Sequence, residues 1–149
     1  LLERAVAELR PILSVETVGM AVRGQGRRRT RQLVHPGQSS VLLAAGHGLV
    51  DATECELFPR TCDGLELLHW PDLDAPEAAW ATGFRGVGLT ALASSPITSG
   101  NQVHGVLWAA QRGGESLTHD TLDLLETLCP LLAVRVEAAQ LSERLQGLH

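Results

Sequence analysis

Six residues that could bind a small molecule lie within one stretch, ELLHWPDLDAPEAAWATGFRG (residues 66–86). They are His69, Trp70, Asp72, Trp80, Phe84 and Arg85. Aromatic rings stack on a ligand, a guanidinium such as that of Arg85 pairs with an anionic group, and the Asp72 carboxylate can accept hydrogen bonds. The chain has only three Trp, two Phe and no Tyr, so three rings in this stretch indicate a ligand site or a special packing role.

A second interpretation of these rings needs no ligand. Trp70, Trp80 and Phe84 could fill the core while the neighbouring charged side chains face water, because large aromatic side chains contribute much of the apolar area that a core buries. Pro71 and Pro76 break the stretch into loop and short helix, which suits either role. The sequence leaves open whether the rings surround a cavity or fill it.

The cysteines offer a different, catalytic chemistry. Cys55 and Cys62 could meet if their loop folds back, and Arg60 lies between them as a cation that would favour a thiolate. The third cysteine, Cys129, falls in the last predicted helix. Three cysteines are an odd and sparse set, which argues against a disulfide framework and favours a reducing cytoplasm.

Metal and nucleic-acid sites are not indicated. No two of His47, His69 and His104 stand three or four residues apart, and no cysteine pair has zinc-ligand spacing, although a single His could suffice for haem iron. The run RRRTR (27–31) has no interleaved aromatic residue for base stacking, so a solvated strand edge explains it better. The net charge of −5 also makes nucleic acid an unexpected partner. No metal is predicted, and the identity of any cofactor stays unknown.

The composition is that of one globular domain. A length of 149 residues suits a single core, and 44% apolar with 19% charged residues are typical of a folded chain. No apolar run approaches the ~18 to 20 residues of a membrane span. Because the chain starts without Met and ends in a helical pattern, we expect residues 1–149 to be one domain of a longer protein.

Apolar periodicity predicts the elements that must position these residues. In order they are a helix over 1–13, strands over 15–23 and 30–35, a short helix over 41–45, a strand over 65–69, a helix over 75–84, strands over 87–94 and 102–111, and a long helix after Thr118. Asp74 and Thr118 are the expected helix caps, and TSGN is the expected hairpin turn. This order predicts an α+β sandwich, in which helices are grouped on an antiparallel sheet.

The last helix carries more apolar surface than one buried face requires. One seam runs through Leu124, Leu128, Leu131, Val134, Ala138, Leu141 and Leu145, and a neighbouring seam runs through Leu125, Leu128, Leu132, Val136 and Ala139. A single buried face needs an apolar arc of only ~100°. We therefore expect this helix to pack on the sheet and also on a second copy of the chain, the alternative being a helix buried within the monomer. Pro130 should bend it.

Three segments resemble the sequence pattern of a GAF domain: GFRGVG, SSPITSGNQVHGVLWAA and SLTHDTLDLLETL. In that family's usual pattern a Gly precedes the fourth strand, a Pro-apolar pair closes it, and Gly-Val-Leu lies in the fifth. Here the matching residues look like Gly86, Pro96-Ile97 and Gly105-Val106-Leu107. HWPDLDAP resembles the family's Pro-Asp at a strand end, before the helix that covers the pocket.

The resemblance implies a fold and a function. It places the terminal helices on one face of the antiparallel sheet, and pocket-covering helices and loops on the other, with the pocket between the sheet and residues 65–90. It implies a non-catalytic small-molecule sensor of a cytoplasmic signalling protein, which forms a homodimer through its terminal helices and passes the signal through the last helix to an output domain. A ligand-free dimerisation module and a cysteine-dependent free methionine sulfoxide reductase remain as alternatives.

Overall fold

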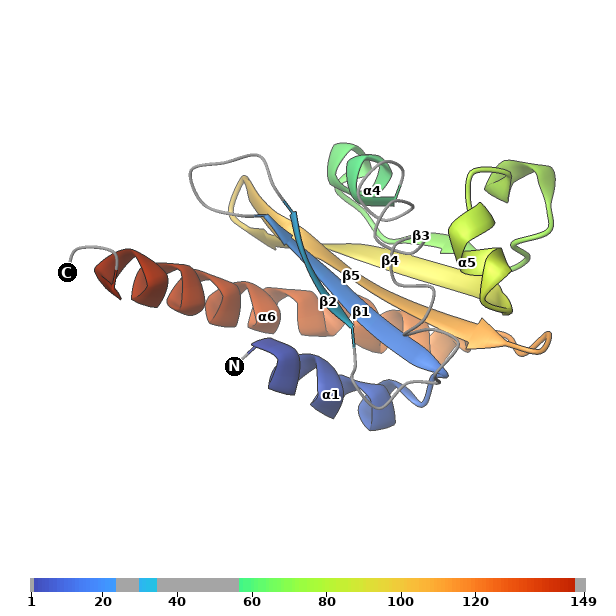
Figure 1. Cartoon of the computed structure of the whole chain (residues 1–149), viewed down its shortest axis with the longest axis horizontal. Coiled ribbons are helices and arrows are strands. Elements are labelled where there is room, and N and C mark those ends of the chain that lie inside the picture. Colours follow the sequence, from blue (N-terminus) through green and yellow to red (C-terminus); the bar gives the residue numbers. More distant parts are fainter. Residues whose placement is uncertain (1, 24–29, 35–56, 147–149) are drawn as a thin grey trace.

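The computed structural model describes residues 2–23, 30–34 and 57–146 (Figure 1). Along the chain the elements are α1 (Leu2–Leu13), β1 (Thr17–Arg23), β2 (Thr30–Val34), α4 (Phe58–Gly64), β3 (Leu68–Trp70), the 3₁₀ helix η2 (Pro76–Ala78), α5 (Thr82–Gly86), β4 (Leu89–Ser99), β5 (Gln102–Arg112) and α6 (His119–Gln146). The predicted helix over 41–45, together with His47 and Cys55, lies outside the described residues.

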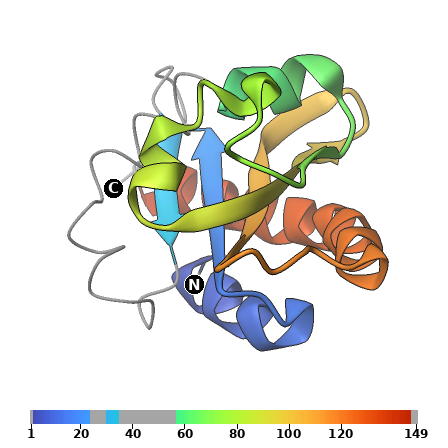
Figure 2. The same ribbon diagram turned by 90° about the vertical axis from the view of Figure 1, so that its right-hand side faces the viewer.

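The strands form one antiparallel sheet in the order β2-β1-β5-β4-β3. Helices α1 and α6 cover one face, and α4, η2 and α5 cover the other (Figures 1 and 2). Side chains alternate along β5, so that Leu107 and Ala109 join the core under α1 and α6, whereas Trp108 and Ala110 join the core under α5. The predicted α+β sandwich, with the terminal helices on one face of an antiparallel sheet and the covering helices on the other, is therefore confirmed.

The hairpin and the start of the last helix also agree with the sequence. The turn between β4 and β5 holds Gly100 at φ 60°, the left-handed conformation that glycine adopts without strain. Strand β4 is longer than predicted, since its pairing with β5 continues past Pro96 to Ser99. Thr118 caps α6 as expected, because its Oγ1 accepts a hydrogen bond of 3.1 Å from the backbone N–H of Thr121.

The segment before β4 differs most from the prediction. The single helix expected over 75–84 is wrong: the chain forms η2 and then α5, and η2 begins after Ala75 without a side-chain cap from Asp74. The bonds Ala78 N to Ala75 O and Ala81 N to Ala78 O have the three-residue spacing of a 3₁₀ helix. This tighter winding accompanies the complete burial of Ala78 and Ala81, and such packing overrides helix propensity.

Strand β3 and helix α4 also depart from the prediction. The strand expected over 65–69 occupies Leu68–Trp70, because Leu65 is used instead as the left-handed C-cap of α4 at φ 53°. Helix α4 itself was not predicted. Its Thr61 hydroxyl pairs with Ser94 of β4 at 2.7 Å, and this buried contact fixes α4 on the sheet.

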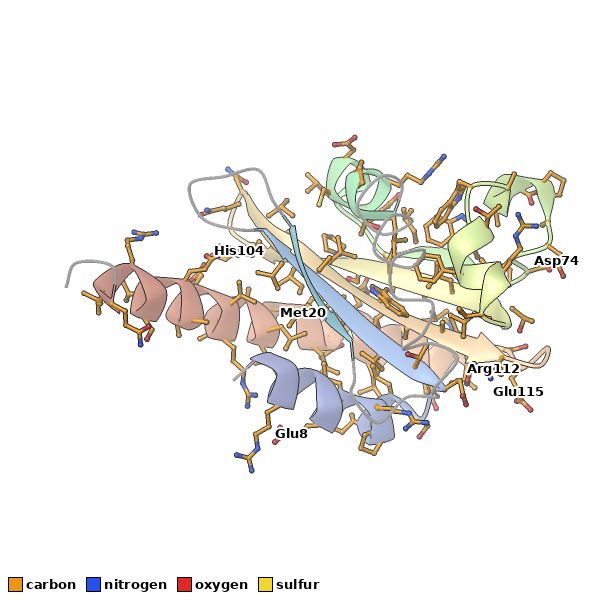
Figure 3. The ribbon with its side chains drawn as sticks, viewed as in Figure 1. Glu8, Met20, Asp74, His104, Arg112 and Glu115 are labelled. Carbon is orange, nitrogen blue, oxygen red and sulfur yellow. The ribbon has the colours of Figure 1, made fainter. Side chains whose placement is uncertain are left out.

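One residue of β5 breaks the alternation of its side chains. The pairing with β4 passes from Ile97–Gly105 to Thr98–Val103, which leaves His104 as an extra, bulged residue. The bulge turns the His104 side chain toward α6, where its Nε2 lies 2.9 Å from Oε1 of Glu137 (Figure 3). His104 is buried, so this contact ties the hairpin to the second half of α6.

A glycine on β1 makes room for the largest side chain in the core. Gly19 pairs with Trp108, and a Cβ on Gly19 would lie 2.1 Å from Cζ2 of the indole. The Trp108 ring therefore lies across the bare backbone of β1.

We predict that Gly19→Ala destabilises the domain by about 1–3 kcal/mol, because a new Cβ would overlap the buried Trp108 ring and force it to shift. Gly86→Ala is the matched control, since a Cβ there meets nothing within 4 Å. Urea unfolding of both variants measures the difference. Equal free energies of unfolding for the two variants would contradict the close packing on Gly19.

We also predict a pH-dependent effect of Glu137→Gln. The Ser99 hydroxyl, followed by His104, holds the pKa of Glu137 below its usual range. A lowered folded pKa contributes stability above the unfolded pKa and loses it as the pH falls through the folded value. In thermal unfolding, the variant should thus have a lower Tm than the wild type near pH 7. The difference in Tm between the two proteins should become smaller below about pH 4. Glu115→Gln, in the exposed loop before α6, should show no such gap.

Candidate functional site

Four rings form a continuous series on the α5 side of the sheet. Trp70 and Trp80 have centroids 5.0 Å apart, Trp80 and Phe84 6.3 Å, and Phe84 and Trp108 5.3 Å, each pair edge to face. Edge-to-face contacts are the favoured geometry of aromatic pairs. The structure thus brings together the three rings of the 66–86 stretch and adds a fourth, Trp108.

Trp108 was not among the predicted site residues. The signal that could have identified it is the alternation of the 102–111 strand, which fixes which of its side chains share a face. Phe84 and Trp108 are almost completely buried, whereas Trp70 and Trp80 are partly exposed. The series therefore runs from the core to the surface.

His69 does not join this ring series. It pairs with Ala93 of β4, and Ala93 belongs to the core under α6. Directly opposed residues of an antiparallel pair point to the same face, so His69 faces the α6 side while Trp70, opposite Leu92, faces the rings. The His69 side chain is exposed in part, and the burial of the remaining part lowers its pKa.

Asp72 and Arg85 are held by local contacts. Asp72 Oδ1 accepts a hydrogen bond of 2.9 Å from the backbone N–H of Asp74, which closes an exposed turn at the outer edge of the molecule (Figure 3). Arg85 Nη2 donates to the carbonyl of Ala79 at 3.4 Å. The cation that contacts the ring series is Arg60 of α4, not Arg85. Its Cζ lies 5.4 Å from the centroid of the Trp80 ring, which is a cation–π contact.

Several buried polar atoms on this side of the sheet have no hydrogen-bond partner among the described residues. They are Trp80 Nε1, Trp108 Nε1, Arg85 Nε and Thr17 Oγ1. Thr17 belongs to this group because it pairs with Ala110, which faces the rings. Buried polar atoms are nearly always hydrogen-bonded, so each of these four atoms calls for an explanation.

The cysteines within the described ranges do not form a reactive pair. Cys62 on α4 packs against Ala21 and Val106, whereas Cys129 on α6 is buried in the core beneath the opposite face. Burial raises the pKa of Cys129 to about 11, so its thiol stays protonated at neutral pH. Within the described ranges no three His, Cys, Asp or Glu side chains gather as metal ligands.

We predict that Cys129 resists alkylation in the folded protein, because a buried thiol with a raised pKa supplies almost no thiolate. Peptide mass spectrometry after brief iodoacetamide treatment near pH 8 should find Cys129 unmodified. In urea the same residue should react fully, which serves as the internal control. Modification of Cys129 at the same rate with and without urea would contradict its burial.

Comparison with known proteins agrees with this geometry. The sequence pattern of the GAF domain matches residues 1–136. No curated protein sequence matches the chain. In the described part of the chain no helix is long and apolar enough to cross a membrane.

Solved structures of low sequence identity share the fold. The photoproduct state of GAF3 from Slr1393 of Synechocystis sp. PCC6803 is 21% identical, with a TM-score of 0.72 and 97% of each chain covered. The GAF domain/HD domain protein from Geobacter sulfurreducens is 14% identical, with a TM-score of 0.68, and the match covers 93% of this chain and 91% of that one.

The second GAF domain of DevS from Mycobacterium smegmatis is 19% identical, with a TM-score of 0.61 and 95% of each chain covered. Sheet order, helix placement and sequence pattern thus agree along most of the length. This chain belongs to the GAF domain family.

Proposed function

We propose that this domain senses a small molecule on the ring-bearing face of its sheet and transmits the bound state through α6, in a homodimer, to an output domain of a cytoplasmic signalling protein. GAF domains are generally sensory and regulatory, and the similar Geobacter sulfurreducens protein combines a GAF domain with an HD domain. The proposal treats residues 1–149 as the sensory domain and involves no catalysis.

The observation that carries this proposal is an exposed apolar stripe on α6. Its members are Leu124, Leu131, Val134, Ala138, Leu141 and Leu145. Four of them recur every seven residues and the other two lie between, which is the heptad spacing of a coiled-coil seam. Leu131 and Val134 are 63% and 66% exposed, far more than apolar side chains of a packed helix usually are.

The opposite side of the same helix is buried on the sheet. Leu125, Leu132 and Val136 belong to the core that α6 shares with β4 and β5. One helix therefore offers one apolar side to its own sheet and a second apolar side to solvent. A second copy is the partner that a self-complementary heptad seam fits, since the same stripe on each copy can pair about a two-fold axis.

Strand β5 links the sensing face to this helix. Trp108 of β5 belongs to the ring series, while the neighbouring Leu107 packs in the core under α6 and His104 contacts Glu137. A shift of β5 on ligand binding would thus act on α6 through side chains in direct contact. The coupling can be no larger than the ligand's difference in affinity between the two states.

A ligand-free dimerisation module is the second candidate, and one observation favours it. Phe84 is completely buried and Trp108 nearly so, which shows that these two rings already contribute to a packed core. Native mass spectrometry of the purified domain separates the two candidates. Added mass on the dimer supports the sensor, whereas a dimer at bare polypeptide mass supports the ligand-free module.

We predict that the double variant Leu131→Glu, Val134→Glu is monomeric, because four charges in the two-fold seam repel one another and cannot be desolvated. Size-exclusion chromatography with light scattering measures the mass. The control is Gln102→Glu, Ser116→Glu, which adds the same charge at two exposed sites that are not part of the α6 stripe. The proposal fails if the wild type is a monomer, or if the seam variant remains a dimer.

A further inference from the structure

The C-terminal end of α6 projects beyond the core of its own domain. Ala139 is the last described residue of this helix that packs against a hydrophobic core. Figure 1 shows the helix continuing past the strands of the sheet. Residues 140–146 form this projecting end and span roughly two helical turns. Exposed side chains follow one another along it, at Leu141, Ser142, Arg144, Leu145 and Gln146.

The projecting end lacks the packing that stabilises a helix in a protein. Helices are held mainly by the burial of an apolar face, and terminal turns without such burial fray. The two leucines of this end, Leu141 and Leu145, are 54% and 56% exposed. Both belong to the exposed apolar stripe of α6. A partner that covers the stripe therefore also supplies the packing that the projecting end lacks.

The spacing of the stripe fits a parallel pairing of two copies. When two helices are parallel and in register, each seam residue meets the same residue of the second copy. Leu145 then meets Leu145, and the other stripe members are matched in the same way. No like charges meet beside the seam. Glu137 lies opposite Ser142 of the second copy, and Arg135 lies opposite Pro130.

An antiparallel pairing fits the stripe less well. Its central register places Leu131 opposite Leu141 of the second copy. Around the two-fold axis Glu137 then meets Glu137, and Arg135 meets Arg135. These like charges repel one another on both sides of the seam.

Displacing the antiparallel register by one heptad removes this repulsion but loses apolar contacts. In one direction Leu145 lies opposite Asp120 of the second copy, a carboxylate that has to stay in water. In the other direction Leu124 lies opposite no residue of α6. Both registers gain an exposed ion pair of Arg144 with an acidic residue, but such a pair contributes less than the burial of a leucine side chain.

We propose that two copies of this chain associate with their α6 helices parallel and in register, and that this contact stabilises the projecting ends as a two-stranded coiled coil. The helical structure of residues 140–146 then depends on the second copy and not on the domain's own core. The two projecting ends lie side by side, so a change in the seam reaches both together. This inference rests on the proposed homodimer and specifies its orientation.

Disulfide cross-linking tests the orientation. Leu124→Cys and Leu145→Cys place a thiol at each end of the seam. Under mild oxidation both variants should form covalent dimers, because in the parallel arrangement each new thiol meets its own counterpart. Glu126→Cys, at an exposed site of α6 outside the stripe, is the matched control and should give no more covalent dimer than the wild type. Non-reducing gel electrophoresis measures the products.

Hydrogen exchange tests the ordering of the projecting end. The amides of residues 140–146 should exchange at least about tenfold faster in the monomeric variant Leu131→Glu, Val134→Glu than in the wild-type dimer, because the end loses its packing. Peptides from β5 should remain protected in both proteins, since both faces of that strand are buried, and they serve as the control for folding.

A dimer in which Leu124→Cys or Leu145→Cys gives no more covalent product than the control would overturn the inference. Equal exchange of residues 140–146 in the wild type and the monomeric variant would overturn it as well. Both results leave the proposed sensory dimer in place, provided that light scattering still finds two copies. A monomeric wild type would remove the proposed dimer together with this inference.

Discussion

The rest of the structure depends on the burial of both faces of β5. The side chains of this strand alternate between two cores, so Leu107 is fixed beneath α6 and Trp108 beneath α5 within one residue of each other. A strand buried on both faces cannot shift its register by one residue without exchanging these two sets of side chains. The helices of one layer are therefore held in a fixed relation to those of the other, which is what communication across the sheet requires.

Much of this fold could be predicted from the sequence because it follows from strong local patterns. The hairpin of β4 and β5 has two mostly apolar runs around a Ser-Gly-Asn turn, and α6 has a threonine cap before a long apolar repeat. The segment of η2 and α5 could not be predicted in the same way. Its winding is decided by the burial of Ala78 and Ala81 against distant residues, and a sequence of good helix formers does not show such contacts.

The candidate site was only partly predictable for a related reason. Grouping residues by their proximity in the sequence was correct for Trp70, Trp80 and Phe84, because all three belong to the core on the α5 side of the sheet. The same grouping was wrong for His69. His69 is adjacent to Trp70 on β3, and adjacent residues of a strand point to opposite faces of the sheet. Thr17 and Trp108, which are 91 residues apart by their numbers, become neighbours only through the pairing of β1 with β5. Such contacts depend on strand order, which the sequence pattern leaves open.

The shortness of β3 has a consequence for how copies of this chain can meet. Strand β3 pairs only with residues 92–94 of β4. In the described part of the chain, the outer edge of β4 beyond Ser94 therefore has no neighbouring strand. An uncovered edge invites another chain to add a strand, and this is a common route to aggregation. Pro96 stands in that edge, and its ring lacks the N–H that an incoming strand would need at this position. Sheet extension along this part of the β4 edge is thereby discouraged.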